Sequence, residues 1–391
     1  MGKSYHKEAI LKTRAVSEAY TRLSEATETI LNPEISEWKK QGGKVIGYFC
    51  SAFPKEIVTA AGMMPFRIRA TGSKGTELSD SLLSNINCTF VRHALNMALS
   101  GEYDFLDGLA MFNSCDNIRR VYDHWICQLN TPFTHFMSLP KKAGPAQVKY
   151  FRGELSTFKQ HMEDQFGTKI TDNQLRNAIK LHNESRKLLR QLYDYRKNEH
   201  PPITGAKTLA ITVAGTALPV ELYNKSLRAL LDEIRTEDKA DGYRTRLMII
   251  GSILDNPGYI DVIESQGGLV VTDSLCFGSR NFWIDIDESA DDPLTSLAQY
   301  YVADRPSCPR TFGMHEQRAQ YIKDMIDNFR VDGVIMERLT FCDVWGYEQF
   351  PLANDFKEWG VPLLMLDREY TLGGIGQLRT RSQAFIESLG R

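Results

Sequence analysis

Cysteine is the residue type in this chain with the clearest chemical potential. Three of the seven cysteines stand where a helix is expected to begin: Cys88 in SNINCTFVRHALNMAL, Cys115 in NSCDNIRRVYDHW and Cys342 in TFCDVWGYEQF. Unpaired backbone N–H groups and the helix dipole at such positions favour a thiolate. Three soft thiolates in one cleft would suit an iron–sulfur cluster better than calcium or magnesium, with zinc as an alternative. The competing interpretation is that each is a small buried residue.

The remaining cysteines are weaker candidates. Cys276 follows an apolar run in TDSLCFGSRNFW and is therefore the strongest rival ligand. Cys50 ends another run in GYFCSAFPKEI and could line the same cleft, although burial explains it equally well. Cys127, within an amphipathic stretch, and Cys308, in RPSCPR, are expected to be structural. The sequence contains no CxxC pair, which argues against zinc ribbons and thioredoxin-like motifs.

The elements that would position these cysteines follow from the hydrophobic pattern. Short apolar runs alternate with amphipathic stretches in both halves of the chain, as in parallel sheets covered by helices. The runs lie at 44–49, 65–70, 108–113 and 133–139 in the first half, and at 207–215, 246–253, 267–275, 333–341 and 361–369 in the second. Ligands of such sheets bind beyond the carboxyl ends of the strands, so the residues after these runs are the candidate site. Cys115 and Cys342 occupy matching places in the two halves.

We therefore expect an α/β protein with two lobes joined by helices. Its regions are an N-terminal helical segment at 1–43, a first α/β lobe at 44–146, a helical bridge at 147–204 and a second α/β lobe at 205–391. The N-terminal segment is helical from residue 8 and interrupted at Asn32-Pro33, because a residue before proline disfavours the helical conformation. The bridge contains two long helices, the second capped by Thr171-Asp172.

Composition excludes several classes of protein. The 391 residues are 42% hydrophobic and 25% charged, which allows large buried cores. The 47 Lys and Arg residues against 49 Asp and Glu residues lack the basic excess of a nucleic-acid binder. The charged N-terminus has no signal-peptide core, and the apolar runs are far shorter than a membrane span. With an odd number of cysteines, we expect a cytoplasmic protein whose thiols stay reduced.

The glycines do not form a nucleotide signature. The sequence contains no GxxxxGK[ST] motif, and neither GSKG nor LGGIG lies between a strand and a helix with Rossmann spacing. We therefore expect neither ATP nor NAD to bind this chain.

Six motifs together resemble one known family. They are GYFCSAFPKEIVTAAGMMPFRI, NCTFVRHALNMAL, FNSCDNIRRVYDHW, VTDSLCFGSRNFW, FCDVWGYEQF and GQLRTRSQAFIE. In this order they look like the 2-hydroxyacyl-CoA dehydratase and benzoyl-CoA reductase family, from about residue 44 to the C-terminus. The closing segment LLMLDREYTLGGIGQLRTRSQAFIESLGR is most similar to the smaller, C- or gamma-type subunits of ATP-dependent benzoyl-CoA reductases. Dehydratase beta subunits are the close second.

The resemblance implies a cofactor and partners. Cys88, Cys115 and Cys342 match the family cysteines that ligate an iron–sulfur cluster, usually [4Fe–4S], and related members carry a double-cubane cluster. The implied fold has two flavodoxin-like, Rossmann-like lobes with the cluster between them. The implied partners are a larger homologous subunit in a heterodimer, an ATP-hydrolysing iron–sulfur activator, a ferredoxin-type electron donor and an acyl-CoA substrate.

The implied reaction has alternatives. We favour the low-potential reductive dearomatisation of benzoyl-CoA, for which a thiolate-ligated cluster in a water-poor cleft is suited. The first alternative is a (R)-2-hydroxyacyl-CoA dehydratase that uses ketyl-radical chemistry. The second is an electron-relay subunit without its own substrate site. A structural subunit without a cluster would instead have the three cysteines far apart.

Two histidines and a serine are candidate catalytic residues. His93 lies five residues after Cys88, and His124 lies nine residues after Cys115, about 13 Å along an ideal helix. Ser51, after the first apolar run, could hydrogen-bond a thioester carbonyl. Each also has a structural interpretation, as a core histidine or a helix-capping serine.

Two groups of basic residues could face ligands or partners. Arg67, Arg69 and Lys74 could meet the phosphates of coenzyme A, although a solvated charged rim is the simpler interpretation. Arg379 and Arg381 lie in the expected terminal helix. Three interpretations are open for them: docking of a partner, internal salt bridges, or simple exposure to solvent.

Overall fold

Two parallel sheets of four strands each form the framework of the protein, as seen in a computed structural model that describes residues 18–234 and 242–390. The first sheet has the order β2-β1-β3-β4 and the second has the order β6-β5-β7-β8. The strands are β1 Val45–Tyr48, β2 Met64–Arg67, β3 Gly108–Phe112, β4 Thr134–Met137, β5 Thr245–Gly251, β6 Gly268–Ser274, β7 Gly333–Leu339 and β8 Leu363–Arg368. The shared strand order is that of the first four strands of a flavodoxin-like sheet. The expected pair of parallel-sheet lobes is therefore confirmed.

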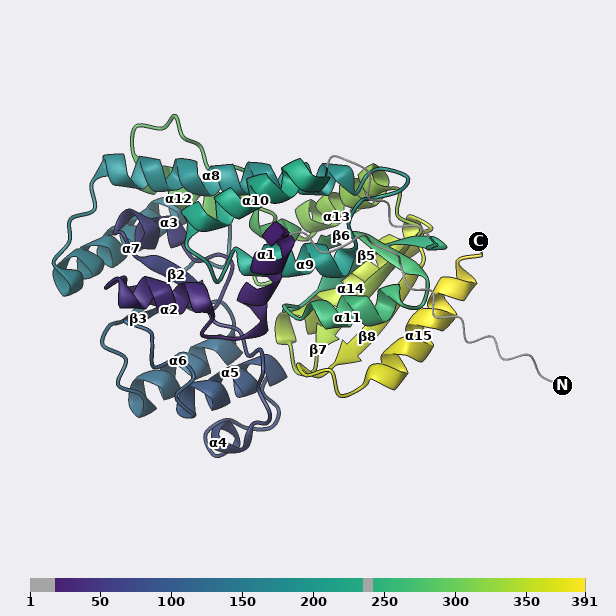
Figure 1. Cartoon of the computed structure of the whole chain (residues 1–391), viewed down its shortest axis with the longest axis horizontal. Coiled ribbons are helices and arrows are strands. Elements are labelled where there is room, and N and C mark those ends of the chain that lie inside the picture. Colours follow the sequence, from purple (N-terminus) through teal and green to yellow (C-terminus); the bar gives the residue numbers. More distant parts are fainter. Residues whose placement is uncertain (1–17, 235–241, 391) are drawn as a thin grey trace.

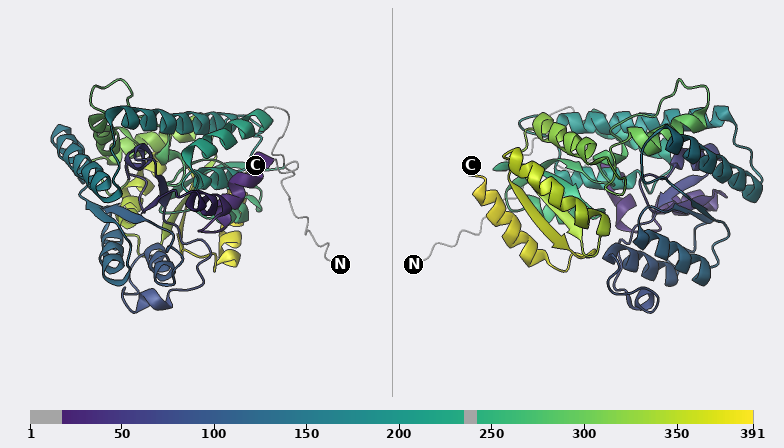
Figure 2. Two further views of the ribbon diagram at one scale, coloured as in Figure 1. Left: turned by 60° about the vertical axis from the view of Figure 1, so that its left-hand side comes forward. Right: turned by 180° about the vertical axis from the view of Figure 1, so that it is seen from behind.

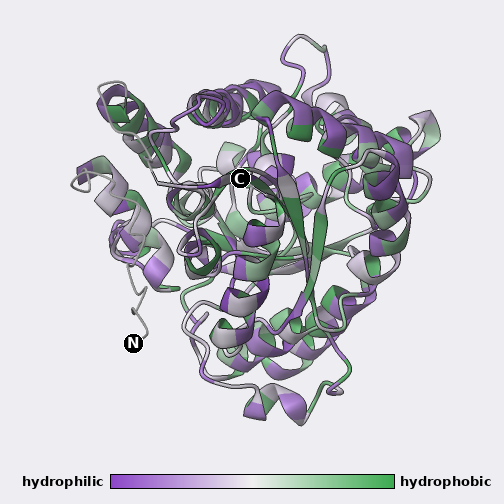
Figure 3. Ribbon diagram, turned by 90° about the vertical axis from the view of Figure 1, so that its right-hand side faces the viewer, coloured by the Kyte–Doolittle hydropathy of each residue, from purple (hydrophilic) through white to green (hydrophobic). Residues whose placement is uncertain are grey.

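Helices cover the sheets and connect them (Figure 1). They are α1 Glu18–Glu28, α2 Pro33–Lys40, α3 Lys55–Ala60, α4 Glu77–Asp80, α5 Thr89–Leu99, α6 Asp116–Gln128, α7 Pro145–Phe166, α8 Asp172–Tyr195, α9 Gly205–Ala214, α10 Val220–Ile234, α11 Pro257–Glu264, α12 Pro293–Gln299, α13 His315–Phe329, α14 Asp343–Glu358 and α15 Ile375–Ser388. Most strands are buried throughout, so their sequences are continuous apolar runs instead of alternating patterns. Figure 3 shows this layering, with hydrophobic strands inside and hydrophilic outer faces on the helices.

The two bridge helices form as expected. Thr171 caps α8, because its side chain accepts a hydrogen bond from the Gln174 amide at 3.3 Å and Gln174 reaches back to the Thr171 amide. Helix α8 contacts α3 of the first lobe and α10 of the second. It therefore spans both lobes, and runs beside α10 along the top of Figure 1.

One predicted strand is wrong: the run at 207–215 is the helix α9. Thr204 caps this helix by accepting a hydrogen bond from the Lys207 amide. Helix α9 packs against α1, α11 and β6, and all but one of its residues are buried. A helix that is buried all round has no polar face, so its sequence cannot be told from that of a buried strand by periodicity.

The N-terminal helices are interrupted at Asn32, as expected, while the expected helical residues 8–17 lie outside the described residues. The Asn32 side chain accepts a hydrogen bond from the Ile35 amide at 2.9 Å and donates to the Ala217 carbonyl at 3.0 Å. Helix α1 packs on α9 and α10 and so lies against the second lobe, whereas Ile35 of α2 packs in one buried core with Val45 of β1 and Phe66 of β2.

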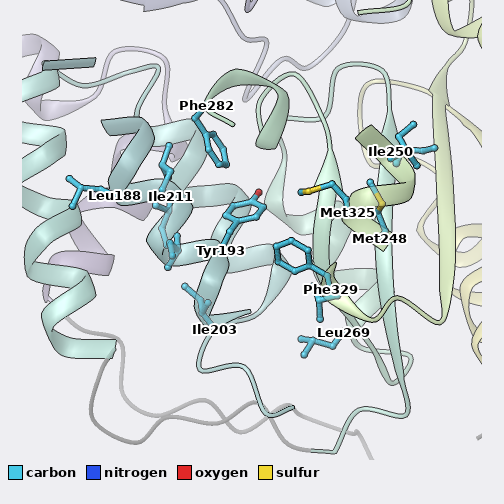
Figure 4. Packing of buried hydrophobic residues seen from close by; sticks show 14 of the residues in the cluster. Leu188, Tyr193, Ile203, Ile211, Met248, Ile250, Leu269, Phe282, Met325 and Phe329 are labelled. Atoms are coloured by element: carbon cyan, nitrogen blue, oxygen red, sulfur yellow. The ribbon is translucent and has the colours of Figure 1, made fainter. Parts of the chain in front are cut away.

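The core of the second lobe forms between α8, α13 and the sheet (Figure 4). Tyr193 on α8 lies edge to face with Phe282 at 5.0 Å and with Phe329 at 6.2 Å between ring centroids. The Tyr193 hydroxyl donates a hydrogen bond to the buried Asp273.

Within the described residues, no helix has the length and hydropathy that a membrane span requires.

The two lobes meet at a shared core. Phe49 and Trp125 of the first lobe pack in one buried core with Ala217, Leu339 and Tyr370 of the second half. The Tyr370 hydroxyl accepts a hydrogen bond from the Ala70 amide at 2.9 Å and donates to Asp255 at 2.7 Å. Through Tyr370, these contacts link the segment after β2 to the segment after β5. Helix α15 lies on the outer side of the second sheet (Figure 2).

Candidate functional site

One pocket between the lobes is lined by six of the seven cysteines. It has a volume of about 90 Å³ and lies beyond the carboxyl ends of strands from both sheets. Its cysteines are Cys50, Cys88, Cys115, Cys276, Cys308 and Cys342. Cys127 is exposed on α6 and does not belong to the lining. All seven cysteines are free thiols.

Cys88, Cys115 and Cys342 share one structural position. Each is the N-cap residue of a helix, with Cys88 before α5, Cys115 before α6 and Cys342 before α14. None of their sulfurs makes a cap hydrogen bond of standard geometry, yet amides of the first turn approach each one and lower the pKa of its thiol. The structure therefore brings the three predicted cysteines together and directs three positive helix ends at one pocket.

Burial dominates the acidity of these thiols. Desolvation raises the pKa of Cys88 to about 11 and that of Cys115 to about 12, and it raises the pKa of Cys342 well above its usual value. The other two thiols raise the pKa of Cys342 further, because like charges close together disfavour ionisation. At neutral pH the three groups are therefore protonated unless a bound cation compensates their charge.

The donor set fits a thiolate-ligated group. Among the described residues, no three His, Cys, Asp or Glu side chains are arranged to hold a single metal ion. In a [4Fe–4S] cluster each cysteine ligates a different iron atom, so the sulfurs need not converge on one point. The three cap cysteines that line the pocket match that requirement, and Cys50, Cys276 and Cys308 supply further thiols in the same lining.

The predictions for Arg67 and Arg69 are wrong. Both side chains are buried, so they form neither a solvated rim nor a surface site for phosphates, whereas Lys74 is exposed. Arg67 donates to Cys276 in the pocket, and Arg69 donates to main-chain oxygens such as Thr27 O at 2.9 Å. Sequence alone could not show this, because carbonyl and sulfur acceptors allow a guanidinium to be buried without a carboxylate partner.

Of the three predicted catalytic residues, Ser51 lines the pocket and the two histidines do not. Ser51 accepts a hydrogen bond from Arg305 Nη2 at 2.9 Å. His93 pairs with Ser73 Oγ at 2.8 Å, and partial burial lowers its pKa. His124 is half-buried on α6, six residues beyond Ile118, the last residue of this helix that lines the pocket.

Several lining residues were not identified from the sequence. Arg280 and Arg310 carry charge to the pocket wall, and Cys308, expected to be structural, also lines it. The position of Cys276 after an apolar run did indicate that it could lie at the site. Nothing in the RPSCPR segment predicts that Cys308 lies at the pocket.

The family of the chain follows from a comparison with known proteins. Residues 50–389 match the family described as 2-hydroxyglutaryl-CoA dehydratase, D-component. This span covers most of the 391 residues, so the chain belongs to that family. The resemblance found in the sequence motifs is thereby confirmed.

Three curated relatives match nearly the whole chain. The C subunit of benzoyl-CoA reductase from Thauera aromatica is 27% identical over 361 residues, covering 90% of this chain and 93% of the relative. The (R)-phenyllactyl-CoA dehydratase beta subunit of Clostridium sporogenes is 27% identical over 369 residues, covering 93% and 97%. The beta subunit of (R)-2-hydroxyglutaryl-CoA dehydratase of Acidaminococcus fermentans is 26% identical over 383 residues, covering 96% and 99%. All three are enzyme subunits, and their names divide between reduction and dehydration.

Proposed function

We propose that this chain is the iron–sulfur subunit of an acyl-CoA enzyme, with Cys88, Cys115 and Cys342 as the cluster ligands. The observation that carries the proposal is that these three helix-cap thiols, from both lobes, line one pocket. A [4Fe–4S] cluster with one position not filled by these three cysteines suits this set, and such a cluster supplies one-electron transfer at low potential.

The protein would contribute the environment of that cluster. Apolar side chains such as Phe49, Phe90 and Leu339 form part of the pocket wall and would limit the access of water to the cluster. Low solvent exposure and thiolate ligation favour a low potential. The helix ends at the three cap cysteines would stabilise the thiolates once they are ligated.

For the reaction we favour ATP-dependent reduction of benzoyl-CoA or a related aryl-CoA. This assignment is supported by the closing segment LLMLDREYTLGGIGQLRTRSQAFIESLGR and by the similarity to the C subunit of benzoyl-CoA reductase. The proposed partners are a homologous larger subunit, an ATP-hydrolysing iron–sulfur activator and a ferredoxin-type electron donor. We propose a cytoplasmic location because the seven free thiols require a reducing compartment. Dehydration of a (R)-2-hydroxyacyl-CoA is the alternative, supported by similar identity to the dehydratase subunits.

One observation favours a second candidate role, electron relay. The cysteine pocket has a volume of about 90 Å³, whereas pockets for organic ligands usually have volumes of about 300 Å³ or more. A cluster would occupy much of this space. The acyl group would then bind in the partner subunit, and this chain would only pass electrons to it.

A cluster with more iron atoms, the double-cubane type, is the alternative to [4Fe–4S]. Cys50, Cys276 and Cys308 line the same pocket as the three cap cysteines. Six thiols would suffice for a double-cubane cluster, and the iron content per chain separates the two cases.

The test is anaerobic co-expression of this chain with a homologous larger subunit, followed by iron and sulfide analysis. The purified complex is then assayed with an ATP-hydrolysing activator and a strong reductant, on benzoyl-CoA and in parallel on a 2-hydroxyacyl-CoA. Iron with turnover of benzoyl-CoA supports the reductase, and turnover of the hydroxyacyl-CoA alone supports the dehydratase. Iron-free wild-type protein would contradict the cluster itself.

A further inference from the structure

Arg67 connects the two lobes at the cysteine pocket. It ends β2 of the first sheet, and its backbone amide donates to the Thr216 carbonyl at 3.0 Å, in the segment between α9 and α10. Its guanidinium donates to the Cys276 carbonyl at 2.6 Å and to the Cys276 sulfur at 3.0 Å, beyond the end of β6. The guanidinium also lies over the Phe277 ring, 3.6 Å from its centroid. Main chain and side chain of one residue therefore hold the second half against the first sheet.

The charge of Arg67 is not neutralised by a carboxylate in direct contact. Its three hydrogen bonds go to the Cys276 carbonyl and sulfur and to the Phe49 carbonyl, none of which is a carboxylate. Arg67 itself is 1% exposed, so solvent screens its charge little. Among the described residues that line the pocket, the acidic side chain is that of Asp343, which is exposed.

Two further guanidiniums reinforce this positive wall. Arg280 is 3% exposed, donates to the Gly251 carbonyl at 3.0 Å and has a buried Nε without a hydrogen-bond partner. Arg310 donates to main-chain carbonyls, including that of Ser114 at 3.0 Å. Of the three, Arg67 is the residue that contacts a pocket sulfur directly.

We propose that Arg67 is a positioning residue that sets the reduction potential of the group held in the cysteine pocket. This inference rests on the proposed iron–sulfur function. Positive charge close to a cluster stabilises its reduced, more negative state and therefore raises the potential, and the bond to the Cys276 sulfur fixes the Arg67 guanidinium at the pocket. The low dielectric of the pocket strengthens the effect of this charge. Arg67 would thus keep the potential of a buried, thiolate-ligated cluster within the range that its electron donor can reach.

The chain contains a matched control in Arg69. Arg69 lies two residues further along the chain, is equally buried and donates to the carbonyls of Ala26, Thr27 and Thr29. It does not line the pocket. Arg69→Lys should therefore disturb packing about as much as Arg67→Lys without changing the surroundings of a cluster.

The experiment compares wild type, Arg67→Met, Arg67→Lys and Arg69→Lys as complexes purified anaerobically with the homologous larger subunit. Iron and sulfide content is measured first, and the midpoint potential is then measured by a dye-mediated titration followed by electron paramagnetic resonance. We expect the potential of Arg67→Met to shift to a more negative value. Arg67→Lys should shift in the same direction by less, because it retains the charge and loses the fork geometry. Arg69→Lys should have the wild-type potential.

The outcomes separate this inference from the proposed function. Wild-type protein without iron would contradict the proposed function. Wild-type iron content with the same midpoint potential in wild type and Arg67→Met would overturn the role of Arg67 alone. If Arg67→Met does not fold, Arg67→Lys decides, and an iron-loaded Arg67→Lys protein with the wild-type potential would equally overturn it. A shift in Arg69→Lys as large as that in the Arg67 variants would assign the effect to packing.

Discussion

Arg186 on α8 donates a hydrogen bond to Glu56 on α3 at 2.6 Å, with side chains that are 2% and 0% exposed. The second oxygen of Glu56 accepts a hydrogen bond from the Tyr301 hydroxyl at 2.7 Å. This buried ion pair ties the bridge to the first lobe, near the strand that leads into the cysteine pocket. A buried pair of this kind is strongly destabilised when one partner is lost, because the other charge stays uncompensated.

The Glu56 pair predicts a pH dependence of stability. Although desolvation opposes ionisation, Arg186, His182 and the other partners lower the pKa of Glu56 from 4.5 to about 2. Since the folded pKa is lower than the unfolded one, this stabilisation is present above pH 4.5 and is lost as the pH falls toward 2. A shift of this size corresponds to about 3 kcal/mol.

The check is urea unfolding of wild type and Glu56→Gln between pH 7 and pH 3. We expect wild type to lose more stability than the variant on acidification, and the variant to be less stable at pH 7. Glu37→Gln, at an exposed residue of α2, serves as the control and should follow wild type. An equal slope with pH for wild type and Glu56→Gln would show that this pair does not carry the effect.

Removal of a cap cysteine should remove iron. In Cys342→Ala the pocket loses one of three ligands, so we expect the iron and sulfide content and the visible absorption of the anaerobic complex to fall to a small fraction of wild type. Cys127→Ala, which changes an exposed cysteine outside the pocket, should retain both. Iron retained in full by Cys342→Ala would show that the ligand set is a different one.

Cys276→Ala tests the number of ligands. Because Cys276 is not one of the three cap cysteines proposed as ligands, we expect this variant to keep the wild-type iron content. A double-cubane cluster held by six thiols should instead lose iron when any one of them is removed. Iron analysis of Cys276→Ala beside Cys50→Ala therefore decides between the two clusters.

The thiols of the iron-free protein should react slowly. Burial raises the pKa of Cys88 to about 11 and that of Cys115 to about 12, and the thiolate is the nucleophile. At pH 8 we expect iodoacetamide to modify the exposed Cys127 well before either of them, as followed by peptide mass spectrometry. Their rates should still be rising between pH 8 and pH 10. Modification of Cys88 at the rate of Cys127 would contradict the burial of Cys88.

Local patterns in the sequence were sufficient for most of the elements. The eight strands were visible as apolar runs, Thr171 marked the start of a helix by its capping side chain, and Asn32-Pro33 marked the interruption between α1 and α2. Cys115 and Cys342 could be placed at the ends of strands for the same reason, since a run of apolar residues shows where a buried strand ends. Apolar runs and capping side chains act over a few neighbouring residues, so the sequence alone is enough to detect them.

Packing between distant segments determined what those elements surround. Whether residues 88, 115 and 342 share a pocket depends on how two sheets pack, which no local spacing encodes. The same packing explains why the run at 207–215 was not recognised as a helix. Burial on nearly every side leaves α9 without the polar face that would have revealed a helical period. Packing also buries Arg67, although the charge of this residue suggests an exposed position. The burial is possible because the Phe49 carbonyl and the carbonyl and sulfur of Cys276 accept its hydrogen bonds. Local patterns thus specify the elements and the thiols they carry, whereas long-range contacts specify which of these groups meet.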